Sequence, residues 1–566
     1  MINNLYNPAF IFILAALTLP FVTGKLRAAV LLAAPLGGLA LLITLGMGSS
    51  SVMLMGYELT PLRIDKLSFI FAIAFHIAAL FSVIYSLHIK DKLQDVAGLL
   101  YMGAAIGACL AGDLLSLFVW WELTAISSVF LIWARRTETS YRAGMRYLII
   151  QVSSGVLLAA GAVIYARATG NLDFLHIGLD SPAGLLIFIA FGIKAAFPLL
   201  HNWLQDAYPK ATVTGTVVLS AFTTKLAIYA LARGFAGESS LIWIGCIMTA
   251  FPILFAVIEN DLRKVLAYSL NNQLGFMVVG IGIGTELAIN GAAAHAFAHI
   301  MYKGLLFMSM GAVLHRVGTI KASELGGLYK SMPITAMLCI IGSMSISAFP
   351  FFSGFVTKSM IMTAAAEQHM WLVYLTLLLA SAGVLDHSGI KIPFFSFFAH
   401  DQGLRCQEAP SNMLVAMFIC AFLCIGIGVY PAPLYALLPY AVDYNAYSAT
   451  HVVTQYQLLF AAMLGFAVLW RKGWYPAEIP SLNLDSDWVY RKLIPTIWGA
   501  VLSTLGQVKE AWDNFFSQSW GDLQHWMKQE MGPKAPIGSN FSTSSSMLGI
   551  VALLGVVCCI GLFFGG

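Results

Sequence analysis

The sequence is divided almost from end to end into apolar runs long enough to cross a lipid bilayer. About 20 residues of α-helix span the hydrocarbon core at a rise of 1.5 Å per residue. A bilayer leaves no water to bind the backbone, so each run is expected to be a helix. We therefore predict an all-α polytopic membrane protein with 14–16 transmembrane helices. The runs fall near residues 9–24, 27–47, 66–88, 95–111, 113–134, 143–167, 182–200, 212–235, 240–258, 265–284, 288–314, 331–350, 370–386 running into 389–399, 411–430, 455–470 and 547–564.

Composition excludes a soluble protein and offers no enzyme signature. Of the 566 residues, 59% are hydrophobic and 10% are charged, against about 25% charged in soluble domains. The eight cysteines show neither a CxxC motif nor Cys/His spacing, so we expect neither a disulfide framework nor a metal site. The sequence lacks a P-loop and a dinucleotide fingerprint. We expect no cofactor and no catalytic centre in this chain, although it could serve a redox-driven translocase.

Basic residues gather on alternate connections between the apolar runs. The positive-inside rule places the richer set in the cytoplasm and the N-terminus outside, in a bacterial cytoplasmic (inner) membrane. The run 9–24 lacks the basic region and cleavage site of a signal peptide, so it is expected to be a span. The richer set is Lys25, Arg27, Lys90, Lys92, Arg135, Arg136, Arg142, Arg146, Lys210, Arg263, Lys264, Arg316, Lys321 and Lys330; up to residue 330 the other set holds only Arg63, Lys66, Arg167 and Arg233.

Four apolar runs carry an ionisable side chain. Glu122 lies within LLSLFVWWELTAISSVFLIW (114–133), and Lys194, Lys225 and Lys391 have comparably apolar surroundings. A charge at the centre of a bilayer costs at least about 3 kcal/mol, and such residues usually mark ion or proton pathways. Glu122 and Lys194 are candidates for an acid–base pair whose protonation switches when a third charge approaches. Lys225 is the candidate for that third charge. The alternative is a static ion pair that ties two helices together.

Proline follows two of these lysines closely. Pro198 comes four residues after Lys194, and Pro393 two residues after Lys391. Proline inside a helix removes a hydrogen bond, and interrupted membrane helices are tolerated where they line a cavity or are buried in protein. A lysine beside a broken helix in each half of the chain predicts an internally repeated transporter with sites near the midplane.

Histidines and further charges extend the set of candidates. His295 and His299 are one helical turn apart, and Lys303 follows on the same face. This arrangement favours a proton relay, although a membrane histidine can also serve helix packing. Four residues are weaker candidates: Asp113, which could equally be a helix N-terminal charge, Lys358, which could snorkel to the surface, and Asp386 with His387, which precede Lys391.

The C-terminal region differs from the rest of the chain. Residues 471–546 are polar and rich in tryptophan, and 485–530 indicate a long amphipathic helix along the membrane or against neighbouring chains. An interfacial helix that binds only lipid is the alternative. We expect N-terminal helices at 1–90, a translocating core at 91–430 and a helical region at 431–470. A lateral segment at 471–546 and a final span at 547–566 complete this division.

Five motifs in order resemble one protein family. They are GDLLSLFVWWELTAISSVFLI (112–132), KAAFPLLHNWLQDAYPKATVTGTVVLSA (194–221), ENDLRKVLAYSLNNQLGF (259–276), HAFAHIMYKGLLFMSMGAV (295–313) and FPFFSGFVTKSMI (349–361). They resemble the antiporter-like subunits shared by respiratory complex I, membrane-bound hydrogenases and Mrp-type multisubunit cation/proton antiporters. The resemblance covers about 90–430. GIKIPFFSFFAHDQGLRCQEAP (389–410) is most similar to the D-type subunit of Mrp-type antiporters, whereas the extended C-terminus looks more like the lateral helix of the distal complex I-type subunit.

The resemblance implies two inverted five-helix repeats, each with a broken helix. By motif match, Glu122 corresponds to the family's key glutamate, Lys194 to the broken-helix lysine and Lys225 to the bridging lysine. His299 falls in the connecting relay. Lys391 falls at the charge of the second broken helix, where some members carry glutamate.

Together these features predict a proton-translocating subunit of a multisubunit Na⁺/H⁺ antiporter. The expected partners are other membrane subunits, the lipid bilayer, and H⁺ together with Na⁺ or K⁺; no nucleic acid is expected. One alternative is the same module in a complex I-like quinone oxidoreductase or membrane-bound hydrogenase. Another is the membrane partner of an inorganic-carbon uptake complex.

Overall fold

Helices form wherever the sequence is apolar. The computed structural model describes residues 6–54, 56–480, 483, 485–532 and 543–564, and it divides into two units, Met1–Asn483 and Leu484–Gly566. Among the described residues, twelve helices are long and apolar enough to cross a membrane, and three shorter apolar helices accompany them. The predicted polytopic all-α membrane protein is therefore confirmed.

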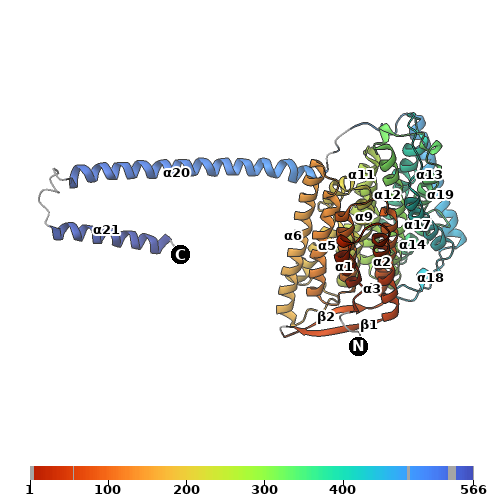
Figure 1. Ribbon diagram of the computed structural model, residues 1–566, viewed down its shortest axis with the longest axis horizontal. Helices are drawn as coiled ribbons and strands as arrows, with labels where there is room; N and C mark the ends of the chain where they lie inside the picture. The colour runs from red at the N-terminus through yellow and green to blue at the C-terminus, as the bar shows by residue number, and fades with distance from the viewer. Residues whose placement is uncertain (1–5, 55, 481–482, 484, 533–542, 565–566) are drawn as a thin grey trace. The chain divides into compact units, whose positions relative to one another are not determined.

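The first unit contains most of the helices (Figure 1). Its longer ones are α1 (Ala9–Thr18), α2 (Gly24–Leu45), α3 (Lys66–Ser86), α4 (Lys92–Leu110), α5 (Leu114–Trp133), α6 (Glu138–Thr169), α7 (Pro182–Ala195), α9 (Val213–Gly234), α10 (Ser239–Ile258), α11 (Leu262–Ile283), α12 (Glu286–Val317), α13 (Pro333–Ile346), α14 (Ser353–Glu367), α15 (Trp371–Val384), α17 (Ser411–Val429) and α19 (Ala449–Arg471). The shorter α8 (Asn202–Ala207), α16 (Lys391–Pro393) and α18 (Ala432–Tyr435) join them.

A β-hairpin, absent from the sequence-based expectation, lies at one end of this bundle (Figure 1). Strands β1 (Gly48–Leu54) and β2 (Tyr57–Ile64) pair antiparallel, with Gly48 opposite Ile64 and an irregularity between Ser50 and Val52. The hairpin connects α2 to α3. The hairpin was not predicted because the expected elements are all long apolar runs. The connection between α2 and α3 is too polar and too short to contain such a run.

Side-chain caps fix where many of the helices begin. The first four N–H groups of a helix have no partner within the helix, and a capping side chain satisfies one or more of them. Among the described residues, nine N-cap side chains accept such bonds, namely those of Asp65, Asp91, Asp113, Thr137, Ser181, Thr212, Asp261, Thr285 and Ser448. At the other end, Gly170, Gly284 and Gly318 close α6, α11 and α12 in the left-handed conformation.

Two helices are broken by the same local sequence. After α7, Ala196 and Leu199 take φ values of 61° and 69° in Ala-Phe-Pro-Leu. After α13, Ala348 and Phe351 take φ values of 58° and 72° in Ala-Phe-Pro-Phe. Left-handed backbone at non-glycine residues is strained and persists only where its surroundings hold it. The second broken helix is therefore α13–α14.

This result corrects the prediction of a break at Lys391–Pro393. One helix runs from Trp371 to Phe398, with π-helical turns at Leu385–Ile390 (η6) and Phe394–Phe398 (η7) on either side of α16. The π-helical turns accommodate the proline without ending the helix. Helix α14 was not predicted either, because Ser, Thr and Lys interrupt its apolar pattern.

The second unit contains the predicted amphipathic helix. A π-helical turn, η8 (Val489–Leu493), leads into α20 (Ile494–Met531), and α21 (Thr543–Phe564) follows. Apolar side chains on α20 are exposed, including those of Trp498, Trp512 and Trp520. Exposed apolar patches on a helix usually mark a surface for lipid or protein. Part of the expected lateral segment, 533–542, lies outside the described residues.

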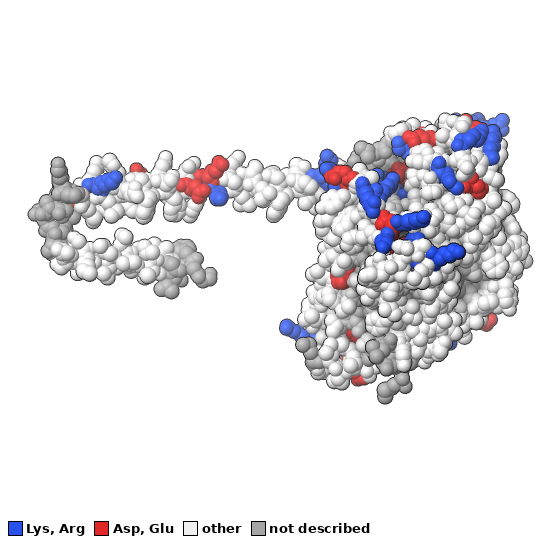
Figure 2. All heavy atoms as spheres, viewed as in Figure 1, with Lys and Arg blue, Asp and Glu red and all other residues white. Residues whose placement is uncertain are grey.

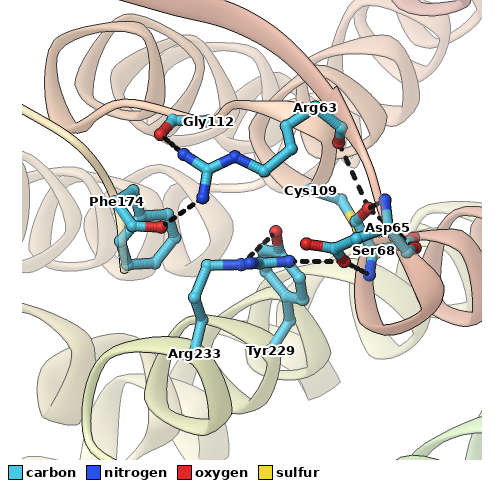
Figure 3. A network of polar contacts seen from close by, with 8 residues as sticks. All are labelled: Arg63, Asp65, Ser68, Cys109, Gly112, Phe174, Tyr229 and Arg233. Carbon is cyan, nitrogen blue, oxygen red and sulfur yellow. Dashed lines mark hydrogen bonds and ion pairs between the residues drawn. The ribbon is translucent and has the colours of Figure 1, made fainter. Parts of the chain in front are cut away.

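A buried arginine joins several elements beside the hairpin (Figure 3). The Arg233 guanidinium donates to Asp65 Oδ1 at 2.7 Å and to the Tyr229 hydroxyl at 2.9 Å. Arg63 donates to the carbonyl oxygens of Phe174, at 3.0 Å, and Gly112. The network therefore ties β2 and the start of α3 to α9 and to the connections before α5 and before α7.

We predict that losing the Asp65 carboxylate destabilises the bundle. Asp65→Asn keeps a capping side chain but leaves the Arg233 guanidinium, 8% exposed, without its ion-pair partner. The cost should fall between about 1 kcal/mol for an exposed pair and about 3–5 kcal/mol for a fully buried one. Asp65→Ala should cost about 1 kcal/mol more through the lost cap. Thermal unfolding in detergent measures both variants.

The matched control is Glu324→Gln, which removes the exposed Lys321–Glu324 ion pair. Exposed pairs contribute little, so its unfolding temperature should stay at the wild-type value. Equal unfolding temperatures for Asp65→Asn and Glu324→Gln would contradict a structural role for the Arg233 network.

Candidate functional site

Glu122 of α5 lies against a glycine of α6. A Cβ added to Gly155 would overlap Glu122 Oε1 and Cδ, so the absence of a side chain there makes room for the carboxylate. Oε1 is buried and accepts no hydrogen bond from the described residues. The carboxylate thus occupies the space between α5 and α6 with one oxygen free.

Lys194 lies near the C-terminal end of α7 and is fully buried. Its ammonium donates to the Trp121 carbonyl oxygen at 2.8 Å and to Thr124 Oγ1 at 2.7 Å, and lies 4.2 Å from the Trp121 ring centroid. Glu122 is its electrostatic partner, but no salt bridge joins the two among the described residues. The expected pair is therefore close without being a static ion pair.

Lys225 of α9 lies near a group of buried basic residues on α12. Its Nζ donates to the Ser220 carbonyl oxygen at 2.5 Å. Neither ring nitrogen of His299, nor Lys303 Nζ, has a hydrogen-bond partner among the described residues. Lys225 acts electrostatically on both His299 and Lys303, so the charges of these three groups influence one another between α9 and α12.

The two α12 histidines differ in their contacts. His295 Nδ1 lies 3.0 Å from Thr357 Oγ1, and its Nε2 lies 3.3 Å from Gln273 Oε1 and 3.2 Å from the Tyr302 hydroxyl. His295 is thus held by three side chains, whereas neither nitrogen of His299 has a partner in the described part of the chain. Gln273 and Tyr302 were not identified from the sequence, because neutral polar residues give no charge signal.

Lys358 is a buried residue of the second broken helix. It is 1% exposed, donates to the Ile346 carbonyl oxygen at 3.0 Å and lies 4.9 Å from the Phe276 ring centroid. Snorkelling to the surface, considered from the sequence, is therefore wrong. Ile346 is the last residue of α13, so Lys358 binds the backbone at the break itself.

His387 and Lys391 occupy the distorted part of the helix that runs from Trp371 to Phe398. His387 Nδ1 lies 2.9 Å from Ser388 Oγ, its Nε2 has no partner among the described residues, and Lys303, Lys358 and Lys391 act on it electrostatically. Lys391 is fully buried. His387 therefore interacts electrostatically both with Lys303 of α12 and with Lys391.

Asp113 is fully occupied as a helix cap. Its Oδ1 accepts from the Ser116 N–H at 2.7 Å, and its Oδ2 accepts from Ser116 Oγ at 2.7 Å and from the Thr60 N–H at 2.9 Å. These contacts correspond to the helix-terminal alternative, and they join α5 to β2.

One carboxylate in contact with this set was not identified from the sequence. Glu478 lies in the segment after α19, and its Oε1 is 2.9 Å from Lys391 Nζ. The sequence gives no signal for it, because Glu478 stands in the polar region after the last span of this unit. Only the folding of that segment onto Lys391 reveals the contact.

Comparison with known proteins identifies the membrane core. Residues 111–383 match the family model described as NADH:quinone oxidoreductase/Mrp antiporter, TM. The chain is 28% identical to hydrogenase-4 component B of Escherichia coli over 416 residues, covering 65% of this chain and 62% of that protein. It is 30% identical to the A-type subunit of the Na(+)/H(+) antiporter of Alkalihalophilus pseudofirmus over 421 residues, covering 65% and 52%. The chain therefore spans about half to two thirds of the length of these relatives.

Two solved structures share the fold. A chain of the Mrp complex from Dietzia sp. DQ12-45-1b matches with a TM-score of 0.66 and 21% identity, covering 80% of this chain and 95% of that one. A chain of the membrane-bound sulfane sulfur reductase, an archaeal respiratory membrane complex, matches with a TM-score of 0.71 and 21% identity, covering 98% and 100%. Residues 111–383 of this chain are therefore similar to the membrane region described for NADH:quinone oxidoreductases and Mrp antiporters, and the two solved structures have the same fold.

Proposed function

We propose that this chain is the proton-translocating subunit of a multisubunit monovalent cation/proton antiporter of the Mrp type. The observation that carries this proposal is the series of buried ionisable side chains on successive helices, several with unpartnered polar atoms. Buried charges inside a membrane are costly and mark ion or proton pathways. Relatives named as Na⁺/H⁺ antiporter subunits support the same conclusion.

Protons would enter the series at Glu122. Its free carboxylate oxygen can take up a proton, and this removes the negative charge beside Lys194. An ammonium that loses a nearby negative charge releases its proton more readily. Lys194 would then pass a proton toward Lys225, and the carbonyl and hydroxyl acceptors around Lys194 would hold the amine in place.

His299 would carry the proton from Lys225 into the second half. A neutral imidazole accepts a proton on one nitrogen and can release one from the other. Neither nitrogen of His299 has a partner among the residues that the structure describes, and Lys225, Lys303 and Lys358 act on His299 electrostatically. His295 is tied to neighbouring side chains and would position α12. From there the route would continue through Lys303 and His387 to Lys391.

A second candidate function is the same role in a redox-driven respiratory complex. It is favoured by one observation: the match to the reductase chain covers 98% of this chain, against 80% for the Mrp chain. Both settings use the same translocating core, which we propose to span 91–430. Genes for small antiporter subunits beside this one would support the first function, and genes for iron–sulfur subunits the second.

We place the protein in a bacterial cytoplasmic membrane with the hairpin end outside. In Figure 2, lysine and arginine gather toward the opposite end of the bundle, as the positive-inside rule predicts for the cytoplasmic side. The exposed apolar residues of α20 suit a helix that lies along neighbouring subunits or lipid.

The first functional prediction concerns Glu122. Glu122→Gln is nearly isosteric but cannot accept a proton, so proton flux driven by an imposed cation gradient should fall about 100-fold or more. The assembled complex, purified and reconstituted into proteoliposomes, provides the measurement. Complex yield should match the wild type; unchanged flux at normal yield would refute the role of Glu122.

Gly155→Ala should disturb Glu122 without removing any ionisable group. The added methyl would force the flexible carboxylate into another rotamer, so flux should fall by about tenfold, equivalent to roughly 1.4 kcal/mol. Gly98→Ala is the control, because a Cβ there meets only Met102 Cε at 3.7 Å. If both variants transport at the wild-type rate, the position of the Glu122 carboxylate does not matter.

His299 should matter more than His295 for proton transfer. His299→Gln removes the relay and should cut flux by about tenfold or more. His295→Gln keeps hydrogen-bonding capacity toward Thr357 and Tyr302, so its loss should be smaller. Flux and thermal stability are measured together on both variants. Equal flux in the two would remove His299 from the route.

A further inference from the structure

The environment of Lys391 contains one acidic partner outside the series of relay candidates. Lys391 Nζ donates to the carbonyl oxygens of Val257, at 2.6 Å, and Glu259, at 2.8 Å. Its third close contact is Glu478 Oε1 at 2.9 Å. The Glu478 side chain is 7% exposed. Glu478 is thus a buried carboxylate that the segment after α19 brings against a buried lysine.

The number of acceptors around Lys391 suits both the charged ammonium and the neutral amine of its side chain. An ammonium has three N–H bonds, and two carbonyl oxygens and one carboxylate oxygen surround it. A neutral amine has two N–H bonds, which the two carbonyl oxygens accept, and a lone pair that a protonated Glu478 can bind. A proton can therefore pass between Nζ and Oε1 while both carbonyl contacts persist. The separation of 2.9 Å is within the range of such transfer. Neither carboxylate oxygen of Glu478 accepts a hydrogen bond from the described residues in this geometry, so the carboxyl group must turn toward Nζ before the proton passes.

Further ionisable groups continue from this pair to the surface. Glu259 and Asp386 act electrostatically on Glu478, and Glu259 Oε2 forms an ion pair with Lys264 Nζ at 2.7 Å. The Lys264 side chain is 28% exposed, against 6% for Glu259. Burial raises the pKa of the Glu478 carboxyl, and the charge of Lys391 opposes that rise. This series of groups thus leads from the fully buried amine of Lys391, through Glu478 and Glu259, to the partly exposed amine of Lys264.

We propose that Glu478 is a proton-carrying residue that connects Lys391 to the aqueous phase at the Lys264 end of the bundle. The inference rests on the proposed proton translocation. In the step, the Lys391 ammonium gives its proton to the Glu478 carboxylate, leaving a neutral amine and a neutral carboxylic acid. Glu478 then releases the proton toward Glu259 and solvent. The reverse sequence loads Lys391 from the same side.

Two measurements on the assembled complex test this role. The first is proton flux in proteoliposomes for Glu478→Gln, expected to fall about tenfold or more, and for Glu478→Asp, expected to lie between that variant and the wild type. The matched control is Asp401→Asn, which breaks ion pairs with Lys330 and Arg405 outside the Lys391 group. Asp401→Asn should transport normally. Wild-type flux in Glu478→Gln would overturn the proposal.

The second measurement does not depend on transport. A hydrophobic carbodiimide reacts with protonated carboxyl groups inside a membrane, and peptide mass spectrometry locates the adduct. Glu478 should be labelled in the wild type, faster as pH falls, and faster still in Lys391→Ala, where the carboxylate loses its counter-charge. No adduct on Glu478 at any pH in either protein would overturn its role as a proton carrier. If Glu478 is labelled in a complex that moves no protons, the proposed function is refuted. The labelling would still show that Glu478 takes up a proton.

Discussion

The structure depends on keeping amines buried in a membrane core with few carboxylates near them. Four of the five fully buried lysines discussed above donate to carbonyl or hydroxyl oxygens, and Lys391 alone among them also has a carboxylate within salt-bridge distance. Lys303 has no hydrogen-bond partner among the described residues. Neutral dipoles stabilise an ammonium less than a carboxylate does, so the amines without a carboxylate within salt-bridge distance are held in the charged state less firmly than Lys391. Carboxylates at every site would instead fix the charges in place.

The helix breaks supply part of this environment. In each half, two left-handed residues in an Ala-Phe-Pro-x sequence end one helix segment before the next begins. A broken helix leaves carbonyl oxygens without helical partners, and buried lysines use such groups. Lys358 donates to the final residue of α13, at the second break. Lys391 uses carbonyls at the C-terminal end of α10, which is an ordinary helix end and not a break. The two breaks share this backbone geometry, and the inverted repeats that the family resemblance implied stay a prediction.

Charged residues were easier to predict from the sequence than the contacts around them. Glu122, Lys194, Lys225 and the α12 histidines stood out because a charge in an apolar run is rare and costly. Gly155 and Glu478 did not, because their importance comes from residues far away in the chain. Proline was a misleading signal at Pro393, where π-helical turns kept the helix intact, whereas the real second break used the same short motif as the first.

Proton flux through the reconstituted complex carrying Lys391→Ala tests most directly whether both halves form one route. Lys391 lies far along the series from Glu122, and a single connected route would lose nearly all flux when either residue is removed. Two independent routes would each carry only a share of the protons. Loss of nearly all flux at normal complex yield is the result we predict. Retention of about half the wild-type flux in Lys391→Ala would contradict a continuous path from Glu122 to Lys391.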